Sequence, residues 1–157
     1  MSVILEGESI LNDGTAVFLF GIIYGMHGRL DFLHGFTEFV LLPFIHYKTE
    51  LYRRGLSRPG TTWIEDLKVH AVARLFFRGF IKNIQASWVK LGPKMAQMML
   101  NAGANDLGGT LMEEHISRAA GASYGTYMEI QEMINLIRSI GRRPAQRTTT
   151  YEIVRFF

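Results

Sequence analysis

Hydrophobic positions change their spacing along the chain, and these changes predict alternating strands and helices. Residues 36–47 form a dense apolar run that is rich in β-branched and aromatic side chains and is interrupted by Pro43. This run predicts a buried strand that ends near the proline, because proline cannot donate to a strand ladder. The basic segment that follows, LYRRGLSRPG, contains glycine and proline and is typical of a solvated connection.

Helical spacing begins after this connection. Glu65 lies three residues after Thr62, as a capping box requires, and apolar residues then recur at roughly helical intervals as far as Gly79. Pro93 suits the first turn of a second helix, and Gly103 is expected to end that helix.

Two short runs predict further strands. Residues 83–88, NIQASW, precede the second helix, and residues 104–112, ANDLGGTLM, follow it and run into a glycine-rich turn. Another helix is expected over residues 128–140, and the basic tail after it is expected to be extended. The order from residue 36 onward is therefore strand, helix, strand, helix, strand, helix. This order predicts an α/β fold made of βαβ units with a parallel sheet.

Residues 1–30 differ from the rest because they are apolar, glycine-rich and almost free of lysine and arginine. The most apolar run, residues 15–26, is shorter than the about 18 to 20 residues that cross a bilayer. Acidic residues precede it where a signal peptide carries positive charge, namely Glu6, Glu8 and Asp13. The segment fits a short buried helix or the remnant of a longer membrane helix, and we expect a cytoplasmic protein.

Composition narrows the possible functions. The chain has 157 residues, fewer than the about 250 that a complete (β/α)₈ barrel usually needs. It contains no cysteine, which excludes disulfides, zinc–thiolate sites, a cysteine nucleophile and any cluster held by its own thiolates. A net charge of +3 is too small to indicate nucleic-acid binding.

Polar residues gather where the predicted parallel strands end, which is where α/β folds bind ligands. The candidates are His46, then Asn83, Gln85, Ser87 and Trp88, and finally Asn105 and Asp106 before Gly108 and Gly109. Asn83, Gln85 and Ser87 alternate with apolar residues, so their side chains are expected on one face of the strand.

Each candidate also has a structural explanation. His46 could be a hydrogen-bonded structural residue, and the alternating amides could form an internal network instead of a ligand site. Asn105 and Asp106 could cap the following helix. The sequence Glu113, Glu114, His115 is a weak metal signal, because adjacent residues do not share a helix face.

Several long motifs resemble one enzyme family. The segments GFTEFVLLPFIH, NIQASWVKLGP, GANDLGGTLMEEHISRAAGA and GRRPAQRTTTY, from Gly35 to Tyr151, are similar in sequence and order to the C-terminal part of FO synthase of the CofH type. Related radical enzymes of the menaquinone pathway share the NIQASW and GAND elements and are an alternative. The combination of WVKLG with GGTLMEEHISRAAGA favours the deazaflavin branch.

The resemblance implies a radical S-adenosylmethionine enzyme with a (β/α) TIM-type barrel, of which this chain would be the incomplete C-terminal portion. The family joins a tyrosine-derived 4-hydroxybenzyl fragment to 5-amino-6-(D-ribitylamino)uracil, using S-adenosylmethionine and a 4Fe–4S cluster. The resemblance also implies substrate-binding roles, in which side chains face the cavity and orient the uracil or the cofactor. These side chains are His46, Asn83, Gln85, Ser87, Trp88, Asn105 and Asp106.

The chain also departs from this family. The family binds its cluster through a CxxxCxxC loop, and cysteine is absent here, so we expect no activity without a chain that supplies the rest of the barrel. Residues 3–20 instead resemble a segment of monovalent cation–proton antiporters, in which Asn12 and Asp13 would match a membrane-embedded polar pair. We therefore divide the chain into residues 1–30, an antiporter-like segment, and residues 35–157, the CofH-type barrel region. An antiporter fragment and a non-catalytic binding domain are the alternative functions.

Overall fold

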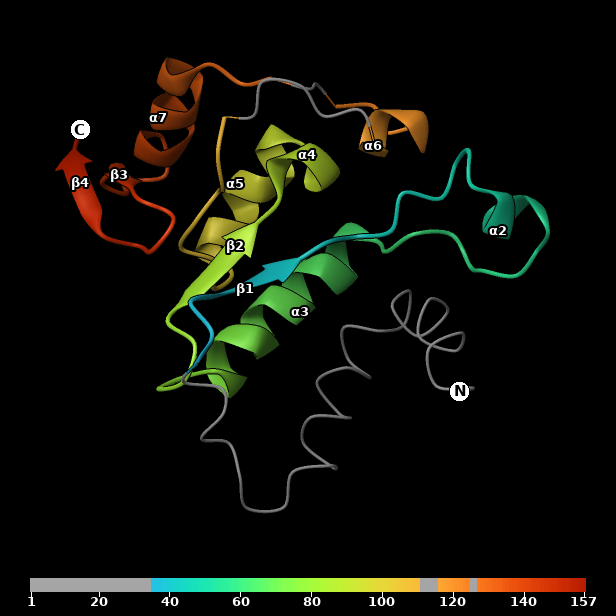
Figure 1. Ribbon diagram of the computed structural model, residues 1–157, viewed down its shortest axis with the longest axis horizontal. Helices are drawn as coiled ribbons and strands as arrows, with labels where there is room; N and C mark the ends of the chain where they lie inside the picture. Colours follow the sequence, from blue (N-terminus) through green and yellow to red (C-terminus); the bar gives the residue numbers. More distant parts are fainter. Residues whose placement is uncertain (1–34, 111–115, 125–126) are drawn as a thin grey trace.

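The computed structural model describes residues 35–110, 116–124 and 127–157 (Figure 1). The short apolar helix expected within residues 1–30 and the Glu113–Glu114–His115 sequence lie outside the described residues. The centre of the described fold is one βαβ unit. It consists of β1 (Glu38–Leu41), α3 (Trp63–Phe76) and β2 (Asn83–Ala86), and the two strands pair in parallel.

The other elements surround this unit, with α2 and α6 towards one end of the molecule and α7 with a hairpin towards the other (Figure 1). In chain order they are α2 (Glu50–Arg53), α4 (Trp88–Leu91), α5 (Pro93–Asn101), α6 (Ile116–Ala119), α7 (Ile130–Arg138), β3 (Ala145–Arg147) and β4 (Ile153–Phe156).

The expected capping box starts the long helix α3. The Thr62 hydroxyl accepts a hydrogen bond from the backbone N–H of Glu65, and the Glu65 carboxylate accepts one from the backbone N–H of Thr62 at 2.6 Å. The bond from the Thr62 backbone, together with the bond from Arg58 at 2.9 Å, lowers the pKa of Glu65 to about 2. The helix begins at its expected residue because both polar side chains needed for the box are present.

The expected third strand is reduced to a single parallel bridge between Gln85 and Asp106. Backbone bonds from Asn105 N to Ile84 O at 3.0 Å and from Ala86 N to Asp106 O at 2.8 Å hold it against β2. It stops there because Gly108 adopts a φ of +78°, which ends the extended backbone. Within the described residues the strands form two two-stranded sheets, and no closed barrel is present.

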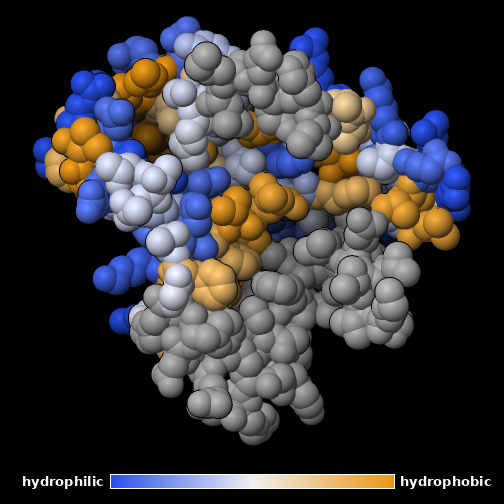
Figure 2. Space-filling model, viewed as in Figure 1, coloured by the Kyte–Doolittle hydropathy of each residue, from blue (hydrophilic) through white to orange (hydrophobic). Residues whose placement is uncertain are grey.

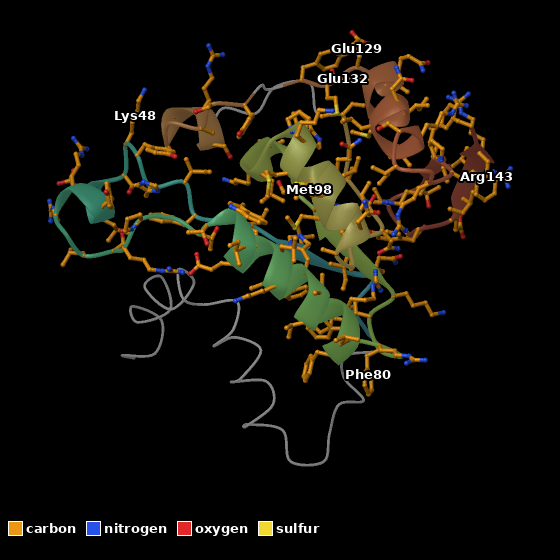
Figure 3. All side chains as sticks on the ribbon, turned by 180° about the vertical axis from the view of Figure 1, so that it is seen from behind. Lys48, Phe80, Met98, Glu129, Glu132 and Arg143 are labelled. Carbon is orange, nitrogen blue, oxygen red and sulfur yellow. The ribbon has the colours of Figure 1, made fainter. Side chains whose placement is uncertain are left out.

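The core lies on one face of the β1–β2 sheet. Ile84 and Ala86 are completely buried against α3 and α5, whereas Asn83 and Gln85, which alternate with them, are half-buried on the opposite face. This alternation confirms the expected separation of polar and apolar side chains along β2. On α5, Met99 is buried in the core, whereas Met98, labelled in Figure 3, is 42 % exposed.

Three short helices correct the sequence-based expectations, and the tail adds a hairpin. Helix α2 forms in the expected loop because Thr49 caps it and Glu50 pairs with Arg53 and Arg54 at 2.8 Å. The strand of residues 83–88 ends at Ala86, and α4 begins at Trp88. The short helix α6 is also additional. The tail is extended as expected, and its two strands form a hairpin in which β3 pairs antiparallel with β4.

Hydrophobic side chains also reach the surface, as Figure 2 shows on one face of the molecule. On α3 the exposed ones include Ile64, Val72 and Leu75. None of the described helices has the length and hydropathy of a membrane span.

The core assignment can be tested with two neighbouring methionines on α5. Met99→Ala is expected to lower the free energy of unfolding by about 2–5 kcal/mol, because it leaves a cavity beside the sheet. Met98→Ala is the matched control and is expected to change that energy by no more than about 0.5 kcal/mol. Chemical denaturation of the full chain measures both. Equal losses for the two variants would contradict the assignment.

Candidate functional site

The polar face of the sheet brings Glu38, Gln85 and Asp106 together. Gln85 lies between the two acidic residues, and its Nε2 donates to Glu38 Oε2 at 3.2 Å and to Asp106 Oδ2 at 2.9 Å. The three side chains meet because β1, β2 and the bridge at Asp106 are adjacent parallel segments. The opposite face is filled by the core, so this is the face of the sheet that offers polar groups.

The C-terminal hairpin adds Arg147 and Tyr151 to this face. Arg147 binds Asp106 with two nitrogens, Nε at 3.1 Å from Oδ1 and Nη2 at 2.6 Å from Oδ2. The Tyr151 hydroxyl lies 2.9 Å from Asp106 Oδ2 and also donates to Glu38. The Arg147 guanidinium stacks 3.8 Å from the centre of the Tyr151 ring. We call Glu38, Gln85, Asp106, Arg147 and Tyr151 the polar cluster.

The hydrogen bonds of the polar cluster decide its ionisation. Burial alone would raise the pKa of Asp106, but the bonds from Arg147, Gln85 and Tyr151 outweigh it, so the pKa lies below its ordinary value. The hydrogen bond to Asp106 raises the pKa of Arg147. Burial, together with the hydrogen bond to Glu38 and the charge of Asp106, raises the pKa of Tyr151. Asp106 is therefore ionised at neutral pH, and the phenol keeps its proton.

Tyr151 has an unusual backbone conformation. Its φ of 66° lies in the left-handed region, and among the described residues it is the one non-glycine residue with a positive φ. Such a conformation costs on the order of 1–3 kcal/mol and persists where other contacts hold the residue in place. The contacts of its hydroxyl and its ring with the polar cluster are those contacts.

Asn83 and Asn105 belong to a second network at the start of β2. Asn105 Oδ1 accepts from the Ile84 backbone N–H at 2.8 Å and from Arg74 at 2.6 Å, and Asn105 Nδ2 donates to Asn83 Oδ1 at 3.2 Å. Asn83 in turn donates to the Thr37 carbonyl at 2.8 Å. These amides therefore join α3 to the strands, at the amino-terminal end of β2, where they were not expected.

Ser87 and Trp88 lie where β2 ends, as expected. Ser87 is the N-cap residue of α4, and its hydroxyl makes no capping hydrogen bond. Trp88 is only 2 % exposed, and its Nε1–H donates to the Gly109 carbonyl at 2.9 Å. The indole thus links the end of β2 to the glycine turn that follows Asp106.

His46 lines a separate cavity of about 220 Å³, together with Asp66, Lys90 and other residues. Its Nδ1 accepts a hydrogen bond from the Gly60 backbone N–H at 2.8 Å. A backbone N–H can only donate, so in the neutral ring the proton is on Nε2. Gly60 is required for this approach, because a Cβ there would lie 2.2 Å from the Phe44 carbonyl oxygen. His46 therefore offers one N–H donor.

Three residues of the polar cluster are absent from the sequence-based candidates. Glu38 gives a weak signal, since it is an acidic residue within an apolar run. Arg147 and Tyr151 give no local signal, because their role depends on contacts with residues far away in the chain. The contact between Tyr151 and Glu38 spans 113 positions.

The sequence is similar to one family of known proteins. A family model described as the CofH/MqnC C-terminal region matches residues 33–156. A Methanopyrus kandleri protein named 5-amino-6-(D-ribitylamino)uracil–L-tyrosine 4-hydroxyphenyl transferase is 60% identical over 123 residues, which cover 78% of this chain and 33% of that protein.

Two further relatives carry the same name. The one from Methanothermobacter thermautotrophicus is 52% identical over 147 residues, covering 87% of this chain and 40% of that protein. The one from Methanocaldococcus jannaschii is 56% identical over 121 residues, covering 77% of this chain and 34% of that protein. The chain thus spans between 33% and 40% of the length of these relatives. The matched family model covers most of the sequence, and the chain belongs to the CofH/MqnC C-terminal region family.

Proposed function

We propose that this chain supplies the C-terminal part of a 5-amino-6-(D-ribitylamino)uracil–L-tyrosine 4-hydroxyphenyl transferase. The observation that carries the proposal is the 60% identity with the Methanopyrus kandleri protein of that name. The matched region is one third of that relative, so in this proposal the reaction requires the remaining part of the enzyme as well. L-Tyrosine and the aminouracil are the substrates, and a chain that supplies the rest of the barrel is the partner.

The parallel strands support this assignment. β1, β2 and the bridge at Asp106 would be adjacent strands of a (β/α) barrel, with α3 and α5 on its outside. The polar cluster would then face the interior, where barrel enzymes place polar groups that hold ligands. In this proposal residues 35–157 are the barrel region and residues 1–30 are a separate segment.

The candidate residues fall into two roles in this proposal. His46 offers its Nε2–H in its own cavity, and Ser87 offers at the end of β2 a hydroxyl that makes no capping hydrogen bond, so each can donate to a carbonyl oxygen of a substrate. The remaining candidates hold the strands and the glycine turn in place through the contacts described above, and Gln85 is treated separately below. These supporting residues are Asn83, Trp88, Asn105 and Asp106.

The cluster of a radical S-adenosylmethionine enzyme does not fit the residues of this chain. A 4Fe–4S cluster is held by cysteine thiolates, and the sequence contains none. The described residues also contain no group of three or more His, Cys, Asp or Glu side chains that could hold a metal ion. In this proposal the cluster ligands belong to the rest of the enzyme, and this chain contributes to substrate binding.

The related menaquinone enzymes are a weaker candidate. The description of the family model includes both branches, but the three relatives above all carry the name of the deazaflavin-type transferase. The antiporter alternative rests on residues 3–20, which lie outside the described residues.

A hybrid enzyme tests the proposed function. Residues 35–157 replace the corresponding third of the Methanopyrus kandleri transferase, and product formation from both substrates is measured by mass spectrometry. The hybrid is expected to work within about tenfold of the unmodified host, a difference of about 1.4 kcal/mol in activation free energy. The host without the replaced third is the control and should be inactive. A folded hybrid that contains its iron–sulfur cluster but forms no product would refute the proposal.

Iron binding tests whether the cluster ligands lie in the rest of the enzyme. After anaerobic reconstitution with iron and sulfide, the 157-residue chain is expected to retain much less than one cluster per molecule, because it has no thiolate ligands. The hybrid, treated in parallel, is expected to retain iron. Iron and sulfide assays with absorption spectra distinguish the two. A stoichiometric cluster on the 157-residue chain would contradict the assignment of the ligands to the rest of the enzyme.

A further inference from the structure

The side-chain amide of Gln85 can adopt only one orientation in the polar cluster. Its two neighbours, Glu38 Oε2 at 3.2 Å and Asp106 Oδ2 at 2.9 Å, belong to carboxyl groups. Asp106 is ionised and accepts hydrogen bonds without donating them, so the NH₂ group of Gln85 must face it. The carbonyl oxygen Oε1 therefore points away from the two acidic side chains.

Oε1 of Gln85 receives no hydrogen bond from any donor in the described part of the chain. Next to it lies Gly108, which follows the bridge at Asp106. A Cβ on Gly108 would lie 3.1 Å from both Cδ and Oε1 of Gln85, tighter than most such contacts. Glycine therefore lets the chain pass close to this amide without crowding Oε1, on the side where parallel strands bind ligands.

Arg147 and Tyr151 keep Gln85 in this orientation through the acidic residues. Arg147 binds both oxygens of Asp106, which fixes the plane of the carboxylate that Gln85 contacts. The Tyr151 hydroxyl joins Asp106 to Glu38, so the two acidic side chains stay on one side of the amide. Without these partners the acidic side chains would repel each other, and the amide could rotate.

We propose that Arg147 and Tyr151 are positioning residues that hold Gln85 so that its Oε1 accepts a hydrogen bond from an N–H group of a substrate. This inference rests on the proposed function and adds to it one hydrogen bond, in which Gln85 is the acceptor and the substrate is the donor. Both substrates named for the relatives carry N–H groups, namely the amino group of L-tyrosine and the N–H groups of the aminouracil. Measuring KM for each substrate separately identifies the donor.

The hybrid enzyme described above provides the assay. Gln85→Met keeps the length of the side chain but removes the acceptor, and it is expected to raise KM for one of the two substrates about tenfold. KM for the other substrate is expected to change by less than about threefold, because that substrate does not use this contact.

The variant Tyr151→Phe tests whether Tyr151 positions the amide of Gln85. It removes only the hydroxyl and is expected to raise KM for the same substrate about threefold to tenfold. In the Gln85→Met background the same change is expected to have little further effect, because the acceptor that it positions is already absent. Tyr127→Phe, on a half-exposed tyrosine outside the polar cluster, is the matched control and should leave both KM values unchanged.

Arg147→Lys provides a second variant if Tyr151→Phe does not fold. It keeps the positive charge but loses the two-nitrogen contact, and it is expected to raise the same KM. Arg155→Lys, on the same hairpin, is its control. The inference is overturned if an active hybrid shows equal changes for both substrates, or if the effects of Gln85→Met and Tyr151→Phe are simply additive. An inactive unsubstituted hybrid refutes the proposed function instead.

Discussion

The rest of the structure depends on the ion pair between Arg147 and Asp106, which joins the parallel sheet to the C-terminal hairpin. Asp106 is the third-strand residue beside β2, and Arg147 belongs to the C-terminal hairpin, 41 positions away. Their side chains are only 12% and 22% exposed, so each charge has lost much of its hydration and is compensated by the opposite charge of its partner. Removing one partner from a fully buried pair costs about 3–5 kcal/mol, since the remaining charge is left uncompensated, and this partly exposed pair belongs at the lower end of that range. The pair therefore holds the hairpin on the polar face of the sheet.

The polar face is a consequence of alternation along β2. Ile84 and Ala86 pack against the helices, which forces Asn83 and Gln85 to the other side. A half-buried amide needs hydrogen-bond partners, and the neighbouring segments supply them. The same packing that stabilises the βαβ unit thus places Gln85 between two acidic residues. Gln85 is therefore placed by the packing of the sheet and is also the residue of the proposed substrate contact.

Local signals in the sequence predicted the local elements. The capping box at Thr62, the proline at the start of α5 and the alternation along β2 each depend on residues close together in the chain, and all are confirmed. The end of β2 and the hairpin were not predicted, because their positions depend on contacts with other segments of the chain. The left-handed conformation of Tyr151 is the clearest example, since contacts with Glu38 and Asp106 hold it. The substrate-binding roles of the candidate residues remain predictions.

The pH dependence of stability tests the role of the ion pair most directly. The pKa of Asp106 is lower in the folded chain than its ordinary value, so Asp106 stabilises the fold above about pH 4 and loses this contribution as the pH falls through the folded pKa. The measurement is the free energy of unfolding of the full chain and of Asp106→Asn between neutral and acidic pH. We predict a difference of about 3 kcal/mol at neutral pH that shrinks as the pH falls below 4. A difference that is absent, or that does not change with pH, would contradict the account.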